Sequence, residues 1–458
     1  MSELRSLLEQ ARYLSRDECE ALAKRTLGFV TIADAARVNI TSGSRGNTRF
    51  AVNQVSTGGD NFDTAVTVTA YAGRRSASST TNQLDDDGLK QAVSTAERLA
   101  KLAPEDPEFM PELEPQQYAP SRNWSETTAT LDPQGRAEAV RTITAPAKQA
   151  GLVSTGYLDT RAGANAAANT KGLFAYSRST ASALTTTVRT PDGSGSGWAG
   201  ASHHDWTRVD PALLGARAAE KARRSRDPGA IEPGRYTVVF EPTAAGNLVQ
   251  FIAFALNARA ADEGRSFFSK PGGGNKIGVK VVDERVTILS DPFDVDVAGA
   301  PFTGEGLPTQ RSVWIENGIV KTLNYDRYWA QKKGVTPTAS GGSLKMSGGN
   351  TSLEDMIAST QRGLLVTRFW YLRPVDQRTI LYTGLTRDGT FLIEQGKITR
   401  AVKNLRFNDS PVFMLNNLEA LGTPVRVSAS EDGGPGQAIV VPPIKVRDFN
   451  FTSLSDAV

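Results

Sequence analysis

Cysteine and histidine are scarce in this sequence, and their scarcity limits the chemistry that it can support. The 458 residues include one cysteine, Cys19, and two histidines, His203 and His204. A lone cysteine cannot form an intrachain disulfide, which favours a reducing compartment. A zinc site needs three or four ligands, and helical sites place histidines a turn apart. Neighbours on a strand point to opposite faces, so we expect the two histidines to share no metal ion.

A strong charge of one sign and long apolar runs are also missing. The 52 basic and 49 acidic residues leave a net charge of +3, so the composition gives no case for nucleic acid as the main partner. The locally basic segment 220–227 suits the C-terminal end of a helix. No apolar run approaches the roughly 20 residues of a membrane span, and the charged first 14 residues do not resemble a signal peptide. We therefore expect a soluble, cytoplasmic protein with no membrane partner.

Three weaker motifs are better explained by structure than by chemistry. Cys19 lies between Glu18 and Glu20, whose charges raise the pKa of a thiol, so we interpret it as a packed residue. The acidic run "DPFDVDVAG" (291–299) lacks the spacing of an EF-hand and is interpreted as a loop. The Gly-rich segment "KPGGGNKIG" (270–278) lacks the phosphate-loop pattern and is interpreted as a mobile loop. No G-x-S-x-G nucleophile motif is present in the sequence.

The first 103 residues are predicted to form an N-terminal α+β lobe. Leucines at helical spacing predict a helix within residues 4–11, and Ser15 with Glu18 forms a capping box that begins a second. Alternating Val- and Thr-rich stretches at 36–43, 47–56 and 64–73 predict an antiparallel meander. A helix over 85–103 follows, with Leu89, Ala92, Val93, Ala96 and Leu99 as its buried stripe.

Proline spacing and a change of period divide the rest of the chain. Five prolines within 104–120 predict an extended connector. Helices near 132–150 and 210–225 flank several strands, which predicts a central α+β lobe at 121–228. Residues 229–458 are mostly strand-like, and "IENGIV" and "IEQGKI" predict hairpins. The predicted fold class is α+β, with a two-lobed N-terminal region of antiparallel sheets and a large β-rich C-terminal domain.

The segment "LVQFIAFALNARAAD" (248–262) is predicted to be a helix with apolar side chains nearly all round. One amide, Gln250, interrupts the run. We expect packing on most sides of this helix, by Val249, Phe251, Ile252, Phe254 and Leu256.

The order of several segments resembles a known family. The strand "TVVFEP" precedes this helix, and "RSFFS", "GEGLPTQRSVWIENGIVKTLNYDRYWAQKKG", "GLLVTRF" and "TRDGTFLIEQGKITRAVKNLRF" follow it, while "NTRFAVNQVS" lies near the N-terminus. Together they resemble the TldD/PmbA family of metallopeptidase-related proteins over nearly the whole chain. The resemblance implies a barrel-like, antiparallel C-terminal domain.

The resemblance also implies where a metal site would lie. In the catalytic branch of the family this helix carries H-E-x-x-x-H, whose histidines bind zinc and whose glutamate is the general base, with a cysteine ligand near the C-terminus. The matching positions here hold Gln250, Phe251 and Ala255, and the C-terminal domain contains no cysteine. Neither Phe nor Ala can ligate zinc or accept a proton from water. The chain therefore resembles the metal-free TldE or PmbA type, and zinc is expected only in a TldD-type partner.

The function implied by the resemblance is that of a non-catalytic subunit. It would pair with a TldD-type catalytic subunit, or with a second copy of itself, around a chamber where unfolded or small peptides lie extended. Plausible wall residues just beyond the apolar part of the helix are Asn257, Arg259, Asp262 and Arg265. Two alternatives stay open: a stand-alone peptide-binding or scaffold protein without a protease partner, and a metal-independent hydrolase that uses other residues.

Overall fold

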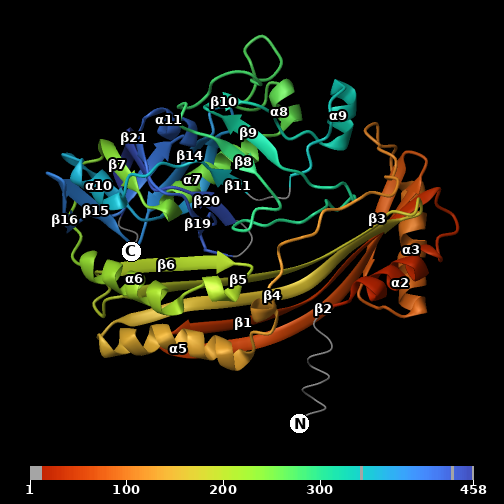
Figure 1. The fold of residues 1–458 in the computed structure, drawn as a ribbon, viewed down its shortest axis with the longest axis horizontal. Coiled ribbons are helices and arrows are strands. Elements are labelled where there is room, and N and C mark those ends of the chain that lie inside the picture. The colour runs from red at the N-terminus through yellow and green to blue at the C-terminus, as the bar shows by residue number, and fades with distance from the viewer. Residues whose placement is uncertain (1–12, 341–343, 435–437, 456–458) are drawn as a thin grey trace.

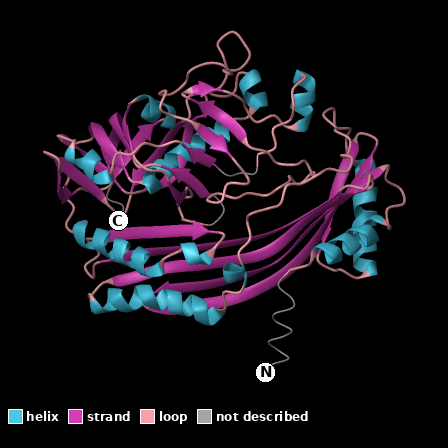
Figure 2. Ribbon diagram, viewed as in Figure 1, coloured by secondary structure: helices cyan, strands magenta, loops and turns pink. Residues whose placement is uncertain are grey.

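The computed structural model describes residues 13–455, except 341–343 and 435–437. The helix expected within residues 4–11 lies outside the described residues. The chain builds a long curved sheet from its N-terminal half, and a second body of strands lies over one face of that sheet (Figures 1 and 2). The predicted α+β class is confirmed: both halves combine helices with mainly antiparallel sheets, and one sheet curls into a half-barrel.

The N-terminal sheet contains six antiparallel strands in the order β3-β2-β1-β4-β5-β6. Their bounds are β1 Ala35–Ala51, β2 Gln54–Ala72, β3 Arg75–Thr81, β4 Val153–Asn169, β5 Phe174–Arg189 and β6 Ser196–His203. Residues 47–56 turn at Val52 and Asn53, so they join β1 to β2 instead of forming a separate strand as predicted. β1 pairs with β4 over fourteen register positions, from Arg37 opposite Asn169 to Phe50 opposite Gly156. The strands of both predicted N-terminal lobes thus belong to one sheet.

Alternation along the strands gives this sheet one apolar face. Val38, Ile40 and Phe50 point to the same side of β1 because side chains alternate along a strand. Four helices cover that side, two near each end of the arc: α2 (Arg16–Leu27) and α3 (Asp86–Leu102), then α5 (Pro133–Gln149) and α6 (Pro211–Arg224) (Figure 1). The capping box of Ser15 and Glu18 is confirmed at the start of α2. Leu99 was wrongly assigned to the buried stripe, because Ala100 is buried in α3 and Leu99 is exposed.

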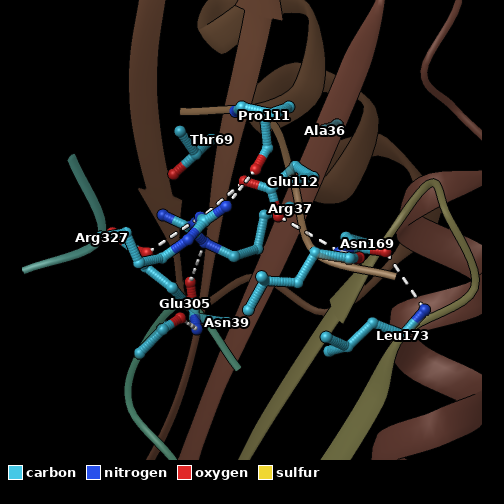
Figure 3. A network of polar contacts seen from close by, with 12 residues as sticks. Ala36, Arg37, Asn39, Thr69, Pro111, Glu112, Asn169, Leu173, Glu305 and Arg327 are labelled. Atoms are coloured by element: carbon cyan, nitrogen blue, oxygen red, sulfur yellow. Dashed lines mark hydrogen bonds and ion pairs between the residues drawn. The ribbon is translucent and has the colours of Figure 1, made fainter. Parts of the chain in front are cut away.

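The opposite face of the sheet is polar and is joined to the C-terminal domain through the proline-rich connector. Arg37 of β1 forms an ion pair of 2.9 Å with Glu112, which also accepts a 3.3 Å hydrogen bond from Asn169 of β4. From the other domain, Arg327 donates a 2.6 Å bond to the carbonyl of Pro111. Figure 3 shows this network. The connector has no helix or strand, as predicted. Its Glu112 binds the N-terminal sheet and its Pro111 binds the C-terminal domain. Two short helical turns follow it in the central segment, α4 (Glu126–Ala129) and the 3-10 turn η1 (Trp206–Arg208).

The C-terminal domain contains two sheets. The nine-stranded sheet has the order β13-β14-β17-β21-β7-β12-β15-β16, with β18 beside β21, and the six-stranded sheet has the order β10-β9-β8-β11-β20-β19. Two pairs are parallel, β7 with β12 and β11 with β20. Strand bounds in the larger sheet are β7 Gly234–Phe240, β12 Arg362–Val366, β13 Phe369–Asp376, β14 Leu381–Thr386, β15 Thr390–Glu394, β16 Lys397–Ala401, β17 Leu405–Asp409, β18 Leu418–Leu421 and β21 Ile444–Leu454. The smaller sheet contains β8 Ile288–Ser290, β9 Ser312–Glu316, β10 Ile319–Val320, β11 Leu344–Met346, β19 Val425–Ser428 and β20 Ala438–Val441.

Both hairpins predicted from Gly-containing turns are present. Glu316 pairs with Ile319, and Glu394 pairs with Lys397. At each turn the residue before glycine, Asn317 or Gln395, and the glycine itself have φ between 50° and 77°. Two consecutive positive φ values are the type I′ geometry that suits the twist of antiparallel strands.

One helix forms the centre of the C-terminal domain. α7 (Pro242–Ala255) packs against β7 of the larger sheet and against β19 and β20 of the smaller one. Its residues 244–252 are all buried. A side chain at Gly246 would meet Val427, Ile439 and Val441 within 3.5 Å, so the helix backbone lies close to the smaller sheet. The remaining helices are α8 Ala258–Asp262, α9 Arg327–Lys333, α10 Leu353–Ala358 and α11 Pro411–Asn416.

None of the helices in the described ranges combines the length and apolarity that a membrane crossing demands.

Candidate functional site

The site begins where α7 ends. Glu241 is the N-cap residue and Pro242 opens the helix, since proline lacks the amide hydrogen that the first turn leaves free. The predicted helix over 248–262 is not continuous: α7 ends at Ala255, and α8 starts after Asn257, whose side chain accepts from the amide of Ala260. The break coincides with this second N-cap, which begins a new helix.

Gln250 serves the core of the domain. Its amide nitrogen donates to the carbonyls of Ala429 at 2.6 Å and of Asn247 at 3.0 Å. Asn247 donates to the same Ala429 carbonyl at 2.8 Å and accepts from the amide of Phe369. A buried amide costs free energy unless it is hydrogen-bonded. The two side chains therefore hold the segment after β19 against the helix.

Phe251, Phe254 and Ala255 lie on another face of the last turn, at i, i+3 and i+4 spacing. The ring of Phe251 stacks on Tyr382 of β14, with ring centroids 3.5 Å apart and planes 12° apart. Phe251 is buried, as predicted. Phe254 was predicted to be packed, but 61% of it is exposed. The helix stops one residue later, so no element covers this outward position.

These residues line a pocket of about 180 Å³ at the end of α7. Of the predicted wall residues, Asn257 and Arg265 also border it, and so does Ala260. The far side comes from the turn between β13 and β14, which brings in Pro374, Gln377, Ile380 and Tyr382. Sequence reasoning did not find this far side, because it lies more than a hundred positions along the chain and carries no motif.

The other two predicted wall residues are held elsewhere. Arg259 forms ion pairs with Glu108 of the connector at 2.6 Å and with Glu263 at 2.9 Å. Asp262 accepts from the indole of Trp329 at 2.8 Å and from Asn275 at 2.8 Å. Burial alone would raise the pKa of Asp262, but these hydrogen bonds and Lys333 lower it. Both side chains fix α8 to its surroundings.

The side chains at the family's metal positions do not fit zinc. Gln250 uses its amide nitrogen in the core, Phe251 is stacked on Tyr382, and Ala255 has no donor atom. Among the described residues no three His, Cys, Asp or Glu side chains are grouped so that they could hold a metal ion. The position of the general base has no group that can take a proton.

The two histidines lie together, so the prediction that they point to opposite faces was wrong. Their ring centroids are 4.4 Å apart. β6 ends at His203, and strand alternation does not extend to His204. Burial, helped by Arg426 and His204, lowers the pKa of His203 to about 4. The amide of Asp205 donates to Nδ1 of His203, which a neutral ring can accept.

The weaker motifs have structural roles. Cys19 is buried, and burial with the neighbouring Glu18 raises the pKa of its thiol to about 11, which suppresses the thiolate. The acidic loop is tied to the sheet by a 2.9 Å ion pair between Asp294 and Lys345. The Gly-rich segment 270–278 forms a loop closed by a bridge between Ser269 and Asn275.

Models of known protein families match almost the whole chain. Residues 36–100 match PmbA/TldA metallopeptidase domain 1, residues 113–226 match the central domain, and residues 233–453 match the C-terminal domain. The chain belongs to the PmbA/TldD metallopeptidase family.

Individual relatives are distant. A metalloprotease from Methanothermobacter thermautotrophicus is 26% identical over 263 residues, which are 53% of this chain and 55% of that protein. The metalloprotease PmbA of Escherichia coli O157:H7 is 22% identical over 242 residues, covering 52% of this chain and 51% of PmbA. The matches span about half the length of these relatives.

The fold extends over the whole of a solved relative. The crystal structure of TldE from Thermococcus kodakarensis superposes with a TM-score of 0.82 and covers 95% of this chain and 100% of TldE. Sequence identity in that superposition is 18%, so the likeness concerns the fold.

Proposed function

We propose that this protein is the metal-free subunit of a TldD/TldE-type metalloprotease complex that degrades or processes unfolded or small peptides. Its partner would be a TldD-type subunit that carries the H-E-x-x-x-H helix and the zinc, or, failing that, a second copy of this chain. A cytoplasmic location agrees with the single, free cysteine.

The main support for the proposal is the packing of Gln250, Phe251 and Ala255, the three positions on α7 where the catalytic branch carries its zinc-site residues. Gln250 and Phe251 are built into the core through the Ala429 carbonyl and the Tyr382 ring. Ala255 adds only a methyl group. This chain keeps the helix and its packing, while the zinc ligands and the base that the resemblance would require are absent. Such a chain can supply shape and surface to a protease, but a hydrolytic step needs groups from another subunit.

The polar face of the N-terminal sheet, formed by β1 to β6, supports a role in holding peptides. Asp159 of β4, with 2% of its side chain exposed, binds Arg45 at 2.6 Å and Arg161 at 2.9 Å. Both guanidinium groups are about half exposed, at 50% and 49%. Arginine presents several donors in a fixed fork, and extended peptides offer carbonyls and carboxylates.

Open sheet edges add a second means of binding a peptide. β13 and β16 end the nine-stranded sheet within the described ranges, and an extended segment can add to such an edge through main-chain hydrogen bonds.

Co-expression with a TldD-type subunit from the same genome tests the proposal. We expect each chain alone to leave unfolded peptides uncleaved, and the purified mixture to cleave them in a chelator-sensitive way. A control complex, in which the motif glutamate of the TldD-type subunit is replaced by glutamine, should be inactive. Activity of this chain alone that survives chelator would favour the metal-independent hydrolase. Failure of the two chains to form a complex would favour the stand-alone scaffold.

A further inference from the structure

The pocket at the end of α7 joins three segments that are far apart in the sequence. The last turn of α7 forms one side, residues 257–266 form the second, and the turn between β13 and β14 forms the third. The pocket has a volume of about 180 Å³. An apolar protein cavity of about 150 Å³ is large enough to bind benzene. The space at the end of α7 therefore matches one phenyl ring or a large aliphatic side chain.

The larger part of the pocket wall is apolar. Phe251 and Tyr382 stack at 3.5 Å, and Ile380 is buried beside them. Phe254 stands edge-on to Phe251, with ring centroids 6.1 Å apart, yet 61% of it is exposed. An exposed aromatic ring at the mouth of an apolar pocket leaves apolar surface in contact with water, and a second ring placed there would bury that surface.

Small side chains keep the space open. Ala255 and Ala260 border the pocket, and each contributes a single methyl group. Position 255 is the one that the resemblance aligns with a metal ligand. Alanine offers no donor atom there, and its small side chain leaves room for a ligand side chain.

The rim is polar without a large net charge. Asn257, Gln377 and Arg265 border the pocket, and Arg265 is paired with Glu263. A rim of two amides and one guanidinium that is held in an ion pair is suited to the carbonyls and amides of a peptide main chain. A charged side chain inside the pocket would meet mainly aromatic and aliphatic walls, because the hydroxyl of Ser266, which also lines the pocket, already donates to the carbonyl of Ala255. It would lose hydration with little compensation.

We infer that this pocket binds an aromatic or large aliphatic side chain of an extended peptide. The inference rests on the proposed function, because a peptide-handling subunit brings such chains to this surface. The degenerate metal position thus becomes a specificity pocket that selects apolar residues in the peptide.

Affinity of the full chain for capped pentapeptides tests the inference. The peptides carry Phe, Leu, Ala or Lys between pairs of glycines, and binding is measured by calorimetry or ligand-observed NMR. We expect the Phe and Leu peptides to bind at least about tenfold more tightly than the Ala and Lys peptides, as removal of apolar groups from a fitted pocket produces. Equal affinity for all four peptides would overturn the inference.

Two variants locate the binding. Ala255→Leu fills the pocket and Phe254→Ala removes its exposed wall, and each should weaken binding of the Phe peptide at least about tenfold. Phe62→Ala is the matched control, because Phe62 is 47% exposed on β2 of the N-terminal sheet and does not line the pocket. If Ala255→Leu lowers the melting temperature, its loss of binding could reflect misfolding, and Phe254→Ala alone then tests whether the peptide binds in the pocket. Undiminished binding by Phe254→Ala, or equal weakening by Phe62→Ala, would contradict the assignment.

The remaining outcomes separate this inference from the proposed function. Concentration-dependent self-association that Phe254→Ala abolishes, without peptide binding, would show that a second copy fills the pocket and would overturn the inference. An active complex with no side-chain preference would overturn the inference alone. A clear preference for Phe and Leu peptides in a chain that forms no active complex would overturn the proposed function, while the inference about the pocket would stand.

Discussion

Phe251 stacks face to face on Tyr382, with ring centroids 3.5 Å apart and an interplanar angle of 12°. The contact joins the last turn of α7 to β14, two elements between which four strands of the smaller sheet, β8 to β11, lie in the sequence. It lies at the position where the family resemblance places a general base. The local chemistry at this position is therefore packing, and the effects of substitution should be effects on stability.

The two phenylalanines at the end of α7 should differ sharply on truncation. Phe251→Ala removes a buried ring and leaves a cavity, so we expect a loss of about 3–5 kcal/mol in the free energy of unfolding. Phe254→Ala removes a ring that is 61% exposed and should cost within about 1 kcal/mol. Denaturant titration of both variants measures the difference. Equal losses would show that Phe254 is covered in solution.

Substitution of the three degenerate positions on α7 should not create a working zinc site. We expect the triple variant Gln250→His, Phe251→Glu and Ala255→His to be destabilised and inactive. It loses the hydrogen bonds of Gln250 to the core and puts a carboxylate in place of a buried ring. It still lacks a cysteine ligand, because the only cysteine is Cys19. Thermal melts, zinc analysis and a peptidase assay measure the outcome, and a stable, zinc-loaded, active variant would contradict the packing role of α7.

Removal of Glu112 from the connector should destabilise the protein far more than removal of Glu114. Glu112→Ala leaves Arg37 facing a buried gap beside Asn169, and we expect a loss of roughly 2–4 kcal/mol. Glu114→Ala breaks an ion pair with Lys171 in which the side chains are 69% and 38% exposed, and should cost less than about 1 kcal/mol. Unfolding midpoints and protease sensitivity of the connector compare the two. Similar behaviour would mean that the connector is held by packing alone.

Stability should fall as the solution becomes mildly acidic, because of the histidine pair. The pKa of His203 is about 4 in the folded chain, below its ordinary value of 6.5. The unfolded chain therefore takes up a proton first as the pH falls below the ordinary value, and folding is progressively disfavoured down to the folded value. Above that window the contribution is constant. Urea unfolding between about pH 5 and pH 7 should show this slope, and His203→Gln should flatten it. An unchanged slope in the variant would assign the effect to other groups.

Local signals in the sequence predicted much of the fold. The capping box at Ser15 and the Gly turns after Asn317 and Gln395 act over a few residues, and the structure contains all three. The continuity of the N-terminal sheet across both predicted lobes was not predicted, because its β1–β4 pairing joins Arg37 to Asn169 across the connector. Long-range pairing of this kind leaves no trace in periodicity.

The candidate site could be predicted only in part for the same reason. The resemblance identified Gln250, Phe251 and Ala255 as one group, but the structure directs Gln250 to Ala429 and the other two toward the pocket. The exposure of Phe254 depends on where α7 stops, which the N-cap at Asn257 decides. Tyr382 completes the pocket from β14, whose position beside α7 no local pattern predicts.

The zinc content of the untagged protein tests the central claim most directly. Metal analysis is performed on the chain purified alone and on its complex with a TldD-type subunit, without a histidine tag in either preparation. We expect the chain alone to carry well under one zinc ion, and the complex to carry zinc in proportion to the TldD-type subunit. One tightly bound zinc ion per chain in the protein alone would contradict the account.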